Sequence, residues 1–433
     1  MRRIASKDVS WDKFLKSLRE RGGFRNKQVR ERVQEILESV RLGGEERLRS
    51  WARLLDGMPQ GTESLEVGAE EWERAQELLS QEHRRALEIA AERIREFHAR
   101  CLLRSWLTVD PQGCLLGQLI QPLETVGIYV PGGKAQYPSS VLMTAIPARV
   151  AGVKEVIMCS PLPWSNPAPG VLAAARIAGV DRVFRLGGAQ AIAAMAYGAG
   201  EIPRVQKIVG PGNVYVTEAK RMVFGDVDID MLAGPSEILI LADGTVRADL
   251  AAADMLSQAE HDQFASALLV TPSRSYADEV ETRLEVQLTQ SPREEIARSS
   301  LENFGAIIIC QDMEEAFTVA AEIAPEHLEL LMERPLDWLP MVRNAGAVFL
   351  GDGSPEAMGD YLAGPSHVLP TGGTARFSSP LGVEDFLKRT SVIGVSRAAM
   401  KHFGPQVIRM AEMEGLAAHA RSVDLRLSPG NPD

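Results

Sequence analysis

The chain has 433 residues, of which 45% are hydrophobic and 24% charged, and its formal net charge is −11. This length predicts two or three domains, and the composition is that of a folded globular protein. The negative charge and the lack of a Lys/Arg-rich block argue against a nucleic-acid partner. The longest apolar-rich stretch, 141–159, is interrupted by Pro147, Arg149, Lys154 and Glu155, so no segment is expected to cross a membrane.

The first 108 residues are expected to be mainly helical. In the segment 69–100, apolar residues recur at three- and four-residue spacing, and the opposite face is rich in Glu and Arg. His83 and His98 fall in this segment and are expected to be solvated or to contribute to packing. The start of the chain lacks the apolar run of a secretory signal, so a cytoplasmic location is expected.

From Gly127 onward, short β-branched runs alternate with alanine-rich stretches of helical character. This alternation predicts an α/β protein with parallel sheets and crossover helices. Ligands of such sheets gather at the carboxyl ends of the strands, and three glycine-bearing turns fall there, at 129–140, 185–198 and 207–220. None matches the Walker A or the dinucleotide-binding glycine pattern, but their succession favours a bound nucleotide.

The four cysteines, Cys101, Cys114, Cys159 and Cys310, show no paired C-x-x-C spacing. This pattern argues against a zinc ribbon, a dithiol redox motif and a disulfide framework. Cys159 ends a strand-like run, where an active-site thiol could lie, but a small buried residue is the favoured interpretation.

Side chains that could bind a metal ion are dispersed along the chain. Gln258 and His261 are three residues apart in a helical pattern and therefore share a face. Histidine is a good zinc ligand and glutamine an unusual one, so this segment is equally compatible with a surface charge cluster. Asp360 and His367 fall in a glycine- and proline-rich loop, a natural place for ligand contacts.

The last fifty or so residues are expected to form a small helical tail. Gly415 would end one helix, and the segment 416–423 would begin another. Glu414 and His419 flank this junction, and their spacing alone favours positions on the helix surface.

The stretch APEHLEL, residues 324–330, places Glu326 and His327 side by side in an apolar run. They could be a structural ion pair, two residues of a strand with one side chain buried, or a proton-transfer pair in an active site. Pro325 suits the first position of a helix. Such a helix would place both side chains in its first turn, where the helix dipole favours a neutral imidazole and a charged carboxylate.

Taken together, the segments from about residue 30 to the C-terminus resemble the histidinol dehydrogenase family. The resemblance rests on GIYVPGG, GGAQAIAA, GPGN, AGPSEILILAD, SQAEHD, PEHLEL, NAGAVFLGDGSPEAMGDY and HVLPTGG, which occur in the family's order. It implies an NAD-dependent, zinc-requiring enzyme that oxidises L-histidinol to L-histidine in two steps, through L-histidinal held on the enzyme. These are the last two steps of histidine biosynthesis.

The resemblance also implies roles for individual residues. His327 would be the general base in both oxidations, and Glu326 would activate the water that attacks the aldehyde. The implied ligands of one zinc ion per site are Gln258, His261, Asp360 and His419. The implied NAD contacts, one in each glycine-bearing turn, are Tyr129, Gln190 and Asn213. The implied substrate contacts are Ser236, His327, Glu414 and the four zinc ligands.

The resemblance further implies two incomplete Rossmann-like domains with small helical segments at both ends. The expected divisions are a helical segment over 1–26, a discontinuous catalytic and zinc-binding domain over 27–128 and 237–381, an inserted NAD-contacting domain over 129–236, and a helical tail over 382–433. The tail is expected to reach the partner's active site in a homodimer, which would place Glu414 and His419 in that neighbouring site.

Two residues depart from the family's pattern. Ser366, just before His367, stands where asparagine is expected, and Lys134 replaces a small polar residue in the first glycine-bearing turn. Neither is an implied zinc or catalytic position.

Two other functions remain compatible with the sequence. The first is a related zinc- and NAD-dependent dehydrogenase that acts on another small alcohol, although Glu414 and His419 favour a substrate with an imidazole. The second is a metal-dependent, nucleotide-binding regulator without catalytic activity.

Overall fold

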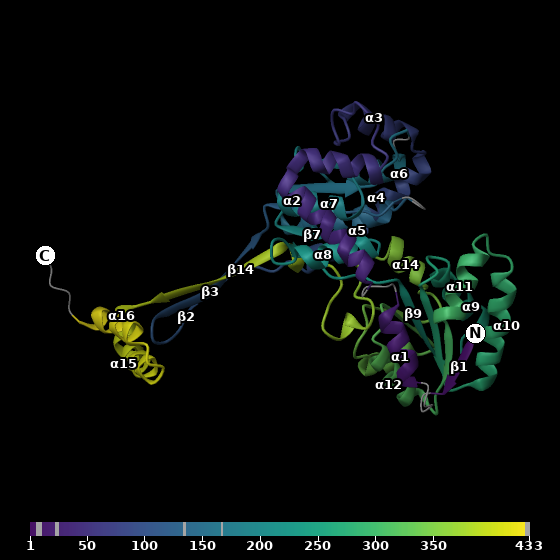
Figure 1. Ribbon diagram of the computed structural model, residues 1–433. Coiled ribbons are helices and arrows are strands. Elements are labelled where there is room, and N and C mark those ends of the chain that lie inside the picture. The colour runs from purple at the N-terminus through teal and green to yellow at the C-terminus, as the bar shows by residue number, and fades with distance from the viewer. Residues whose placement is uncertain (6–10, 22–25, 133–135, 166–167, 429–433) are drawn as a thin grey trace. The chain divides into compact units, whose positions relative to one another are not determined.

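The computed structural model describes residues 1–5, 11–21, 26–132, 136–165 and 168–428 (Figure 1). The chain divides into two compact units: the first comprises Met1–Cys101 and Leu123–Phe386, and the second Leu102–Pro122 and Leu387–Asp433. Lys134 lies outside the described residues. Among the described helices, none is both long and apolar enough to span a membrane.

Two parallel sheets form the frame of the first unit (Figure 1). The larger sheet contains β1 (Arg2–Ala5), β9 (Glu237–Ala242), β10 (Ser266–Thr271), β11 (Ala306–Ile309), β12 (His327–Leu331) and β13 (Ala347–Leu350). Its order is β1-β11-β10-β9-β12-β13. The smaller sheet contains β4 (Thr125–Tyr129), β5 (Glu155–Ser160), β6 (Arg182–Arg185), β7 (Lys207–Val209) and β8 (Asp228–Ile229). Its order is β6-β5-β4-β7-β8, and every pairing in both sheets is parallel.

The strand sequences explain why helices cover both faces of the larger sheet. β9 (EILILA) and β10 (SALLVT) are buried at every residue. Such continuous apolar runs are typical of parallel strands that pack on both faces. Alternate residues accordingly enter two separate cores: Leu239 belongs to the same core as Phe317, and Ile240 to the same core as Ala252. The predicted α/β fold with parallel sheets is confirmed.

Helices connect the strands of the first unit and cover its sheets. They are α1 (Trp11–Glu20), α2 (Lys27–Leu55), α3 (Ala69–Leu78), α4 (Gln81–Arg100), α5 (Pro138–Ala151), α6 (Pro169–Ala178), α7 (Gly188–Tyr197), α8 (Val214–Val223), α9 (Ala248–Ala259), α10 (Arg274–Leu288), α11 (Glu294–Phe304), α12 (Met313–Ile323), α13 (Pro335–Trp338) and α14 (Glu356–Tyr361). Short 3₁₀ turns occur at Leu339–Met341, Thr374–Arg376 and Val383–Phe386. The described residues among the first 108 are thus mainly helical, as predicted. The exceptions include β1, whose pairing with β11 no local pattern indicates, and the residues from Trp106 onward, where a strand of the second unit begins.

The second unit is a three-stranded antiparallel sheet with two helices. Its strands are β2 (Trp106–Val109), β3 (Cys114–Pro122) and β14 (Leu387–Val395), in the order β14-β3-β2. Its helices, α15 (Arg397–Met413) and α16 (Ala417–Leu427), are separated by Gly415 in a left-handed conformation (φ 73°), as predicted. The predicted helical tail over 382–433 is helical in α15 and α16 but not in β14, because β14 pairs along its whole length with β3, a partner far away in the sequence.

Candidate active site

Glu326 and His327 lie at the start of a strand and not in a helix. The preceding helix, α12, is capped by the Asp312 side chain and ends at Ala324, which has a left-handed conformation (φ 53°). His327 is the first residue of β12, which pairs with β9 on one side and β13 on the other. The helix predicted to begin at Pro325 was therefore wrong, because pairing with two neighbouring strands decides the conformation here.

The imidazole of His327 is buried among carboxyl groups. Its Nδ1 atom lies 2.9 Å from the carbonyl oxygen of Glu237, the first residue of β9, and donates its proton there. The ring lies 3.7 Å from Glu326 Oε2, 3.6 Å from Glu356 Oε1 and, through Nε2, 3.7 Å from Asp360 Oδ1. Because the bond to the carbonyl occupies Nδ1, Nε2 is the nitrogen that can exchange a proton.

The protonation preferences of this group differ from those predicted. Burial alone would lower the pKa of His327, but the carboxylates of Glu326, Glu356 and Asp360 outweigh it and raise this pKa well above its ordinary value. Burial raises the pKa of Glu326, and likewise the pKa of Glu356, to about 8. Both shifts are upward, whereas the helix dipole invoked in the prediction would lower both pKa values. Burial and neighbouring acids decide this, since no helix begins here.

Three of the predicted metal ligands come together beside His327. Gln258, in the last turn of α9, has its Nε2 atom 3.4 Å from His261 Nδ1. Ligand atoms of His261, Glu356 and Asp360 all lie within 4.8 Å of one another. Gln258 is fully buried, and its Oε1 atom has no hydrogen-bond partner among the described residues. Nitrogen and oxygen donors around a buried, unpartnered oxygen suit a borderline divalent cation such as zinc.

Glu356 was missed by the sequence analysis. It opens α14, one helical turn before Asp360, and is 1% exposed. Its backbone N–H donates to Glu329 Oε1 at 3.0 Å, but within the described part of the chain neither of its carboxylate oxygens has a hydrogen-bond partner. The four-residue spacing in EAMGD could have indicated a shared helix face. Because the sequence analysis expected a loop at Asp360, it did not consider this helical spacing.

This cluster lies at the end of the larger sheet where β9 and β12 begin. These two strands begin there with Glu237 and His327. α9, which leads back to the start of β10, has Gln258 in its last turn there. The cluster therefore lies at the opposite ends of the strands from those at which ligands of parallel sheets usually gather.

The three glycine-bearing turns do lie at carboxyl ends, those of β4, β6 and β7 in the smaller sheet. The Tyr129 hydroxyl accepts a hydrogen bond from the N–H of Gly188 at 3.1 Å, and Gln190 Nε2 donates to Asp56 Oδ2 at 2.7 Å. Tyr129 and Gln190 are buried, whereas Asn213 is exposed and caps α8 with its side chain. Asp56 follows α2, and nothing in its local sequence indicates this contact.

His367 and the unexpected Ser366 tie the loop after α14 to α5. His367 Nε2 lies 3.2 Å from Ser140 Oγ, and its Nδ1 lies 2.9 Å from the carbonyl oxygen of Asp360. Ser366 is buried, and its hydroxyl donates to the carbonyl oxygen of Met143 at 3.2 Å. Serine at this position therefore anchors the loop through its hydroxyl group.

The remaining predicted substrate contacts fall in both units. Ser236 is half-buried immediately before β9. Glu414 and His419 belong to the second unit, where both are exposed, the first at the end of α15 and the second in α16. The cluster around His327 consists of first-unit residues.

Cys159, in β5, is completely buried, and burial raises the pKa of its thiol. A thiolate nucleophile is disfavoured in such a place. The predicted role in packing is confirmed.

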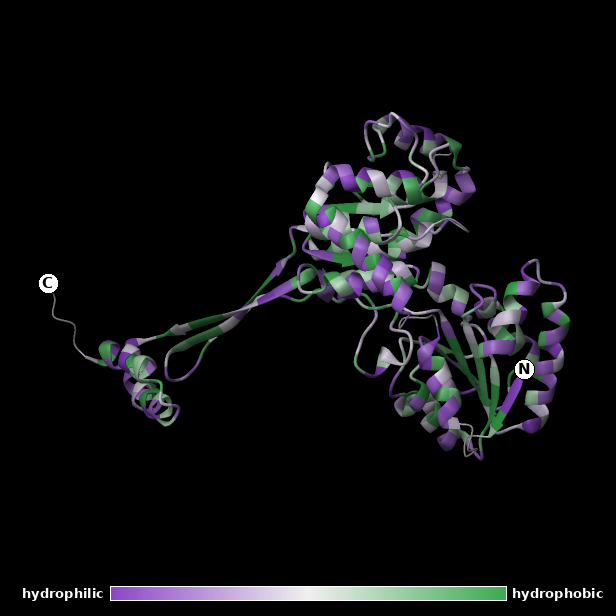
Figure 2. Ribbon diagram, viewed as in Figure 1, coloured by the Kyte–Doolittle hydropathy of each residue, from purple (hydrophilic) through white to green (hydrophobic). Residues whose placement is uncertain are grey.

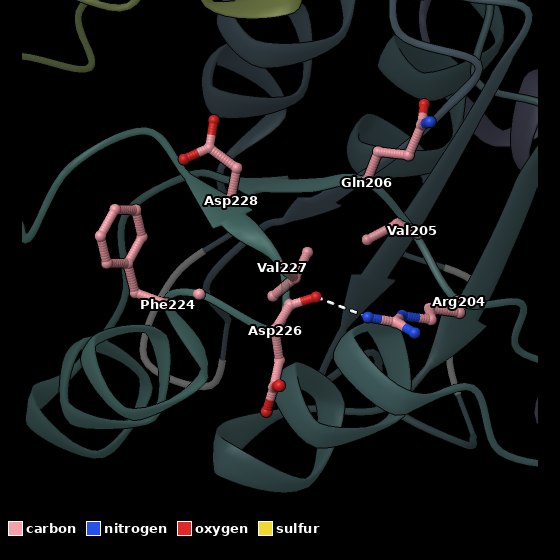
Figure 3. A pocket seen from close by; sticks show the side chains of 8 residues that line it. Arg204, Val205, Gln206, Phe224, Asp226, Val227 and Asp228 are labelled. Atoms are coloured by element: carbon pink, nitrogen blue, oxygen red, sulfur yellow. Dashed lines mark hydrogen bonds between the residues drawn. The ribbon is translucent and has the colours of Figure 1, made fainter. Parts of the chain in front are cut away.

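A hollow of about 480 Å³ lies elsewhere on the smaller sheet (Figure 3). It is lined by Arg204, Val205, Gln206, Phe224, Gly225, Asp226, Val227 and Asp228. Arg204 donates to the carbonyl oxygen of Asp226 at 2.6 Å. These segments precede β7 and β8, so the hollow lies at the edge of the sheet opposite to the three glycine-bearing turns. None of the predicted site residues lines it.

Comparisons with known proteins match almost the whole chain to one family. The family model for histidinol dehydrogenase matches residues 19–427. The histidinol dehydrogenase of Syntrophotalea carbinolica is 52% identical over 427 residues, which cover 99% of each chain. That of Geobacter sulfurreducens is 50% identical over 428 residues, 99% of this chain and 100% of the relative.

A solved structure agrees as well. The crystal structure of histidinol dehydrogenase from Elizabethkingia anophelis superposes with a TM-score of 0.92 at 34% identity, covering 99% of this chain and 98% of that one. These matches confirm the resemblance indicated by the sequence motifs, and the chain belongs to the histidinol dehydrogenase family of oxidoreductases.

Proposed function

We propose that this protein catalyses the NAD-dependent, zinc-requiring oxidation of L-histidinol to L-histidine through L-histidinal, the last two steps of histidine biosynthesis. Family membership supports the substrate, since relatives about 50% identical are named histidinol dehydrogenases. The observation that carries the chemistry is a buried histidine, His327, whose Nε2 faces Asp360 beside a group of side chains that could hold a metal ion.

Gln258, His261 and Asp360 would hold the zinc ion, together with His419. When bound, zinc would orient the imidazole and amino nitrogens of the substrate, polarise its hydroxyl and offset the negative charge of the carboxylates around His327. His327 is then neutral, as a general base must be.

Two residues carry the proton transfers. His327 Nε2 accepts the proton of the substrate hydroxyl while a hydride passes to NAD, and Nδ1 keeps its bond to the Glu237 carbonyl. Glu326 accepts a proton from the water that attacks the aldehyde. The protonated His327 returns its proton to the former aldehyde oxygen, which completes the hydrate and leaves the imidazole neutral again. The hydrate then loses a second hydride to a second NAD, and His327 again accepts the hydroxyl proton.

Tyr129, Gln190 and Asn213 are the proposed NAD contacts. The support is their common position, since each lies at or just after the carboxyl end of a strand in the smaller sheet, where nucleotides bind in parallel sheets. Asn213 also caps α8, and the N–H groups at such a helix start suit a phosphate.

We further propose a homodimer in which the second unit of each chain completes the active site of the other. The support is apolar surface: Leu107, Ile393 and Met413 are 55%, 73% and 80% exposed, and apolar residues recur along the strands and helices of this unit (Figure 2). Exposed apolar patches mark interaction surfaces. A second copy would cover them and receive Glu414 and His419 as contacts for the imidazole of the substrate.

The test is the number of NADH molecules formed per L-histidinol consumed by the purified, zinc-loaded protein. Two NADH with histidine as the product would support the proposal. One NADH with free aldehyde would contradict the role of Glu326. If histidinol gave none while another small amino alcohol did, the related-dehydrogenase alternative would replace it, and no turnover of any alcohol would favour a non-catalytic regulator.

A further inference from the structure

Glu237 is a buried carboxylate that connects three separate segments of the first unit. Its Oε1 atom accepts hydrogen bonds from Arg21 Nη2 at 2.5 Å and from the N–H of Gly372 at 2.7 Å. Its Oε2 atom accepts from the N–H of Glu326 at 3.3 Å, and its own N–H donates to Glu326 Oε2 at 2.8 Å. Glu237 and Glu326 thus hold each other by a reciprocal pair of hydrogen bonds.

Arg21, just after α1, anchors this arrangement through its buried guanidinium group. Its side chain is 3% exposed and that of Glu237 7% exposed. The guanidinium also donates to the carbonyl oxygen of Pro235 at 2.9 Å, the residue before Ser236. A buried ion pair of this kind contributes little net stability compared with apolar residues of the same volume, so stability alone does not account for it.

We propose that Arg21 and Glu237 form a positioning pair that holds Glu326 and His327 in their working orientation. This inference rests on the proposed function of those two residues. Glu326 is held directly, by the reciprocal bonds. His327 is held through the backbone, because the carbonyl group that accepts its Nδ1 proton belongs to Glu237, and the side chain of the same residue is fixed by Arg21 and Gly372.

The two half-reactions should differ in how much they slow when the Arg21–Glu237 pair is disrupted. Glu326 has two hydrogen bonds to Glu237 and would act only on the water of the second oxidation. His327 has one hydrogen bond to Glu237, and it is made to the backbone carbonyl group. The pairing of β9 with β12 also holds that carbonyl group in place. Loosening the pair should therefore slow the oxidation of histidinal more than the oxidation of histidinol.

The experiment uses three variants of the full-length, zinc-loaded protein: Arg21→Met, Arg21→Lys and Glu237→Gln. Each half-reaction is measured separately, with histidinol or histidinal as the substrate. We expect kcat for histidinal oxidation to fall roughly 10–100-fold, as is typical when a group that orients the reacting residues is lost. KM for both substrates and the zinc content should change little, and Arg21→Lys should retain more activity than Arg21→Met.

Arg149→Met is the matched control. Arg149 joins α5 to neighbouring segments through hydrogen bonds to the carbonyl oxygens of Gly179, Val153 and Lys154, at the edge of the smaller sheet away from its glycine-bearing turns. This variant should lose thermal stability and keep the kcat of both half-reactions. If Arg21→Met does not fold, Arg21→Lys and Glu237→Gln decide the question.

A second readout does not depend on turnover. The Nδ1 proton of His327, bonded to a buried carbonyl, should give a downfield proton resonance in ¹⁵N-histidine-labelled protein, identified by its loss in His327→Asn. We expect Arg21→Met and Glu237→Gln to shift or broaden this resonance. Folded variants with an unchanged resonance and wild-type kcat in both half-reactions would overturn the inference. A wild-type protein that oxidises no histidinol would refute the proposed function, while the resonance would still decide whether the pair positions His327.

Discussion

The Nε2 atom of His327 lies 3.7 Å from Oδ1 of Asp360. The proposed base and a proposed metal ligand therefore face each other directly; the His327 side chain is buried, and that of Asp360 is partly exposed. A substrate hydroxyl bound by the metal ion would be within reach of the histidine.

His327→Asn is expected to slow both oxidations by roughly 10²–10⁴-fold, because general base catalysis typically contributes that much. Glu326→Gln should slow mainly the oxidation of histidinal, since only that step needs an activated water. Single-turnover measurements with histidinol and with histidinal would separate the two. His83→Asn, a change of an exposed histidine, is the control, and an equal effect of Glu326→Gln on both steps would refute its assigned role.

Removal of the metal ion by a chelator is expected to abolish activity, and added zinc should restore it. Asp360→Asn and Gln258→Ala should each weaken zinc binding by more than the roughly 10–100-fold typical of outer-shell changes. Titration of the metal-free proteins with zinc measures this directly. Glu260→Gln, next to His261 but outside the cluster, should bind zinc as the wild type does, and equal affinities in all variants would exclude this site.

Mixed dimers should reveal whether the active site is shared. If the second unit of each chain completes its partner's site, His327→Asn and His419→Asn proteins are both inactive alone. Mixed and reassociated, they should recover roughly a quarter of wild-type activity, because half of the dimers are hybrids and each hybrid has one intact site. No recovery would mean that His327 and His419 serve the same site within one chain.

His98 should give the protein a distinct dependence of stability on pH. Both of its ring nitrogens are buried without a hydrogen-bond partner in the described part of the chain, and burial lowers its pKa to about 4. The unfolded chain takes up a proton near pH 6.5, so this contribution is complete above that pH and is lost as the pH falls toward 4.

The expected loss from His98 is about 2 kcal/mol in the free energy of unfolding between pH 6.5 and 4.5. In denaturant unfolding, the free energy of unfolding of His98→Leu should fall less than that of the wild type between pH 6.5 and 4.5, by that amount. His83→Leu, on the exposed side of the same helix, should show the same fall as the wild type. The same pH dependence of the free energy of unfolding in all three proteins would contradict the prediction.

Tyr129→Phe is expected to raise KM for NAD several-fold and to leave KM for histidinol unchanged. The change removes the acceptor of the Gly188 N–H hydrogen bond and so loosens the turn that carries Gln190. Initial rates at varied NAD would show it. An unchanged KM for NAD would place the nucleotide elsewhere.

Much of this protein could be predicted from local sequence. The alternation of β-branched runs and alanine-rich stretches gave the parallel α/β fold, since periodicity and propensity act within a few residues. The motifs around Gln190, Gln258 and His327 indicated the family, which the comparisons confirmed. Gly415 marked the end of a helix because a left-handed position favours glycine.

Other features were decided only by the tertiary structure, because they depend on residues far apart in the chain. β1 and β14 are strands because distant partners supply their hydrogen bonds. His327 begins a strand, and not a helix, for the same reason.

Burial determined the rest. The pKa shifts of Glu326 and His327 are set by burial and by the carboxyl groups that the fold places beside them, and Glu356 joins the candidate metal site only because α14 packs there. Arg21 and Glu237 lie more than two hundred positions apart in the sequence. The sequence by itself determined which groups are available, and folding decided which of them meet without water between them, since only there do charges and hydrogen bonds act at full strength.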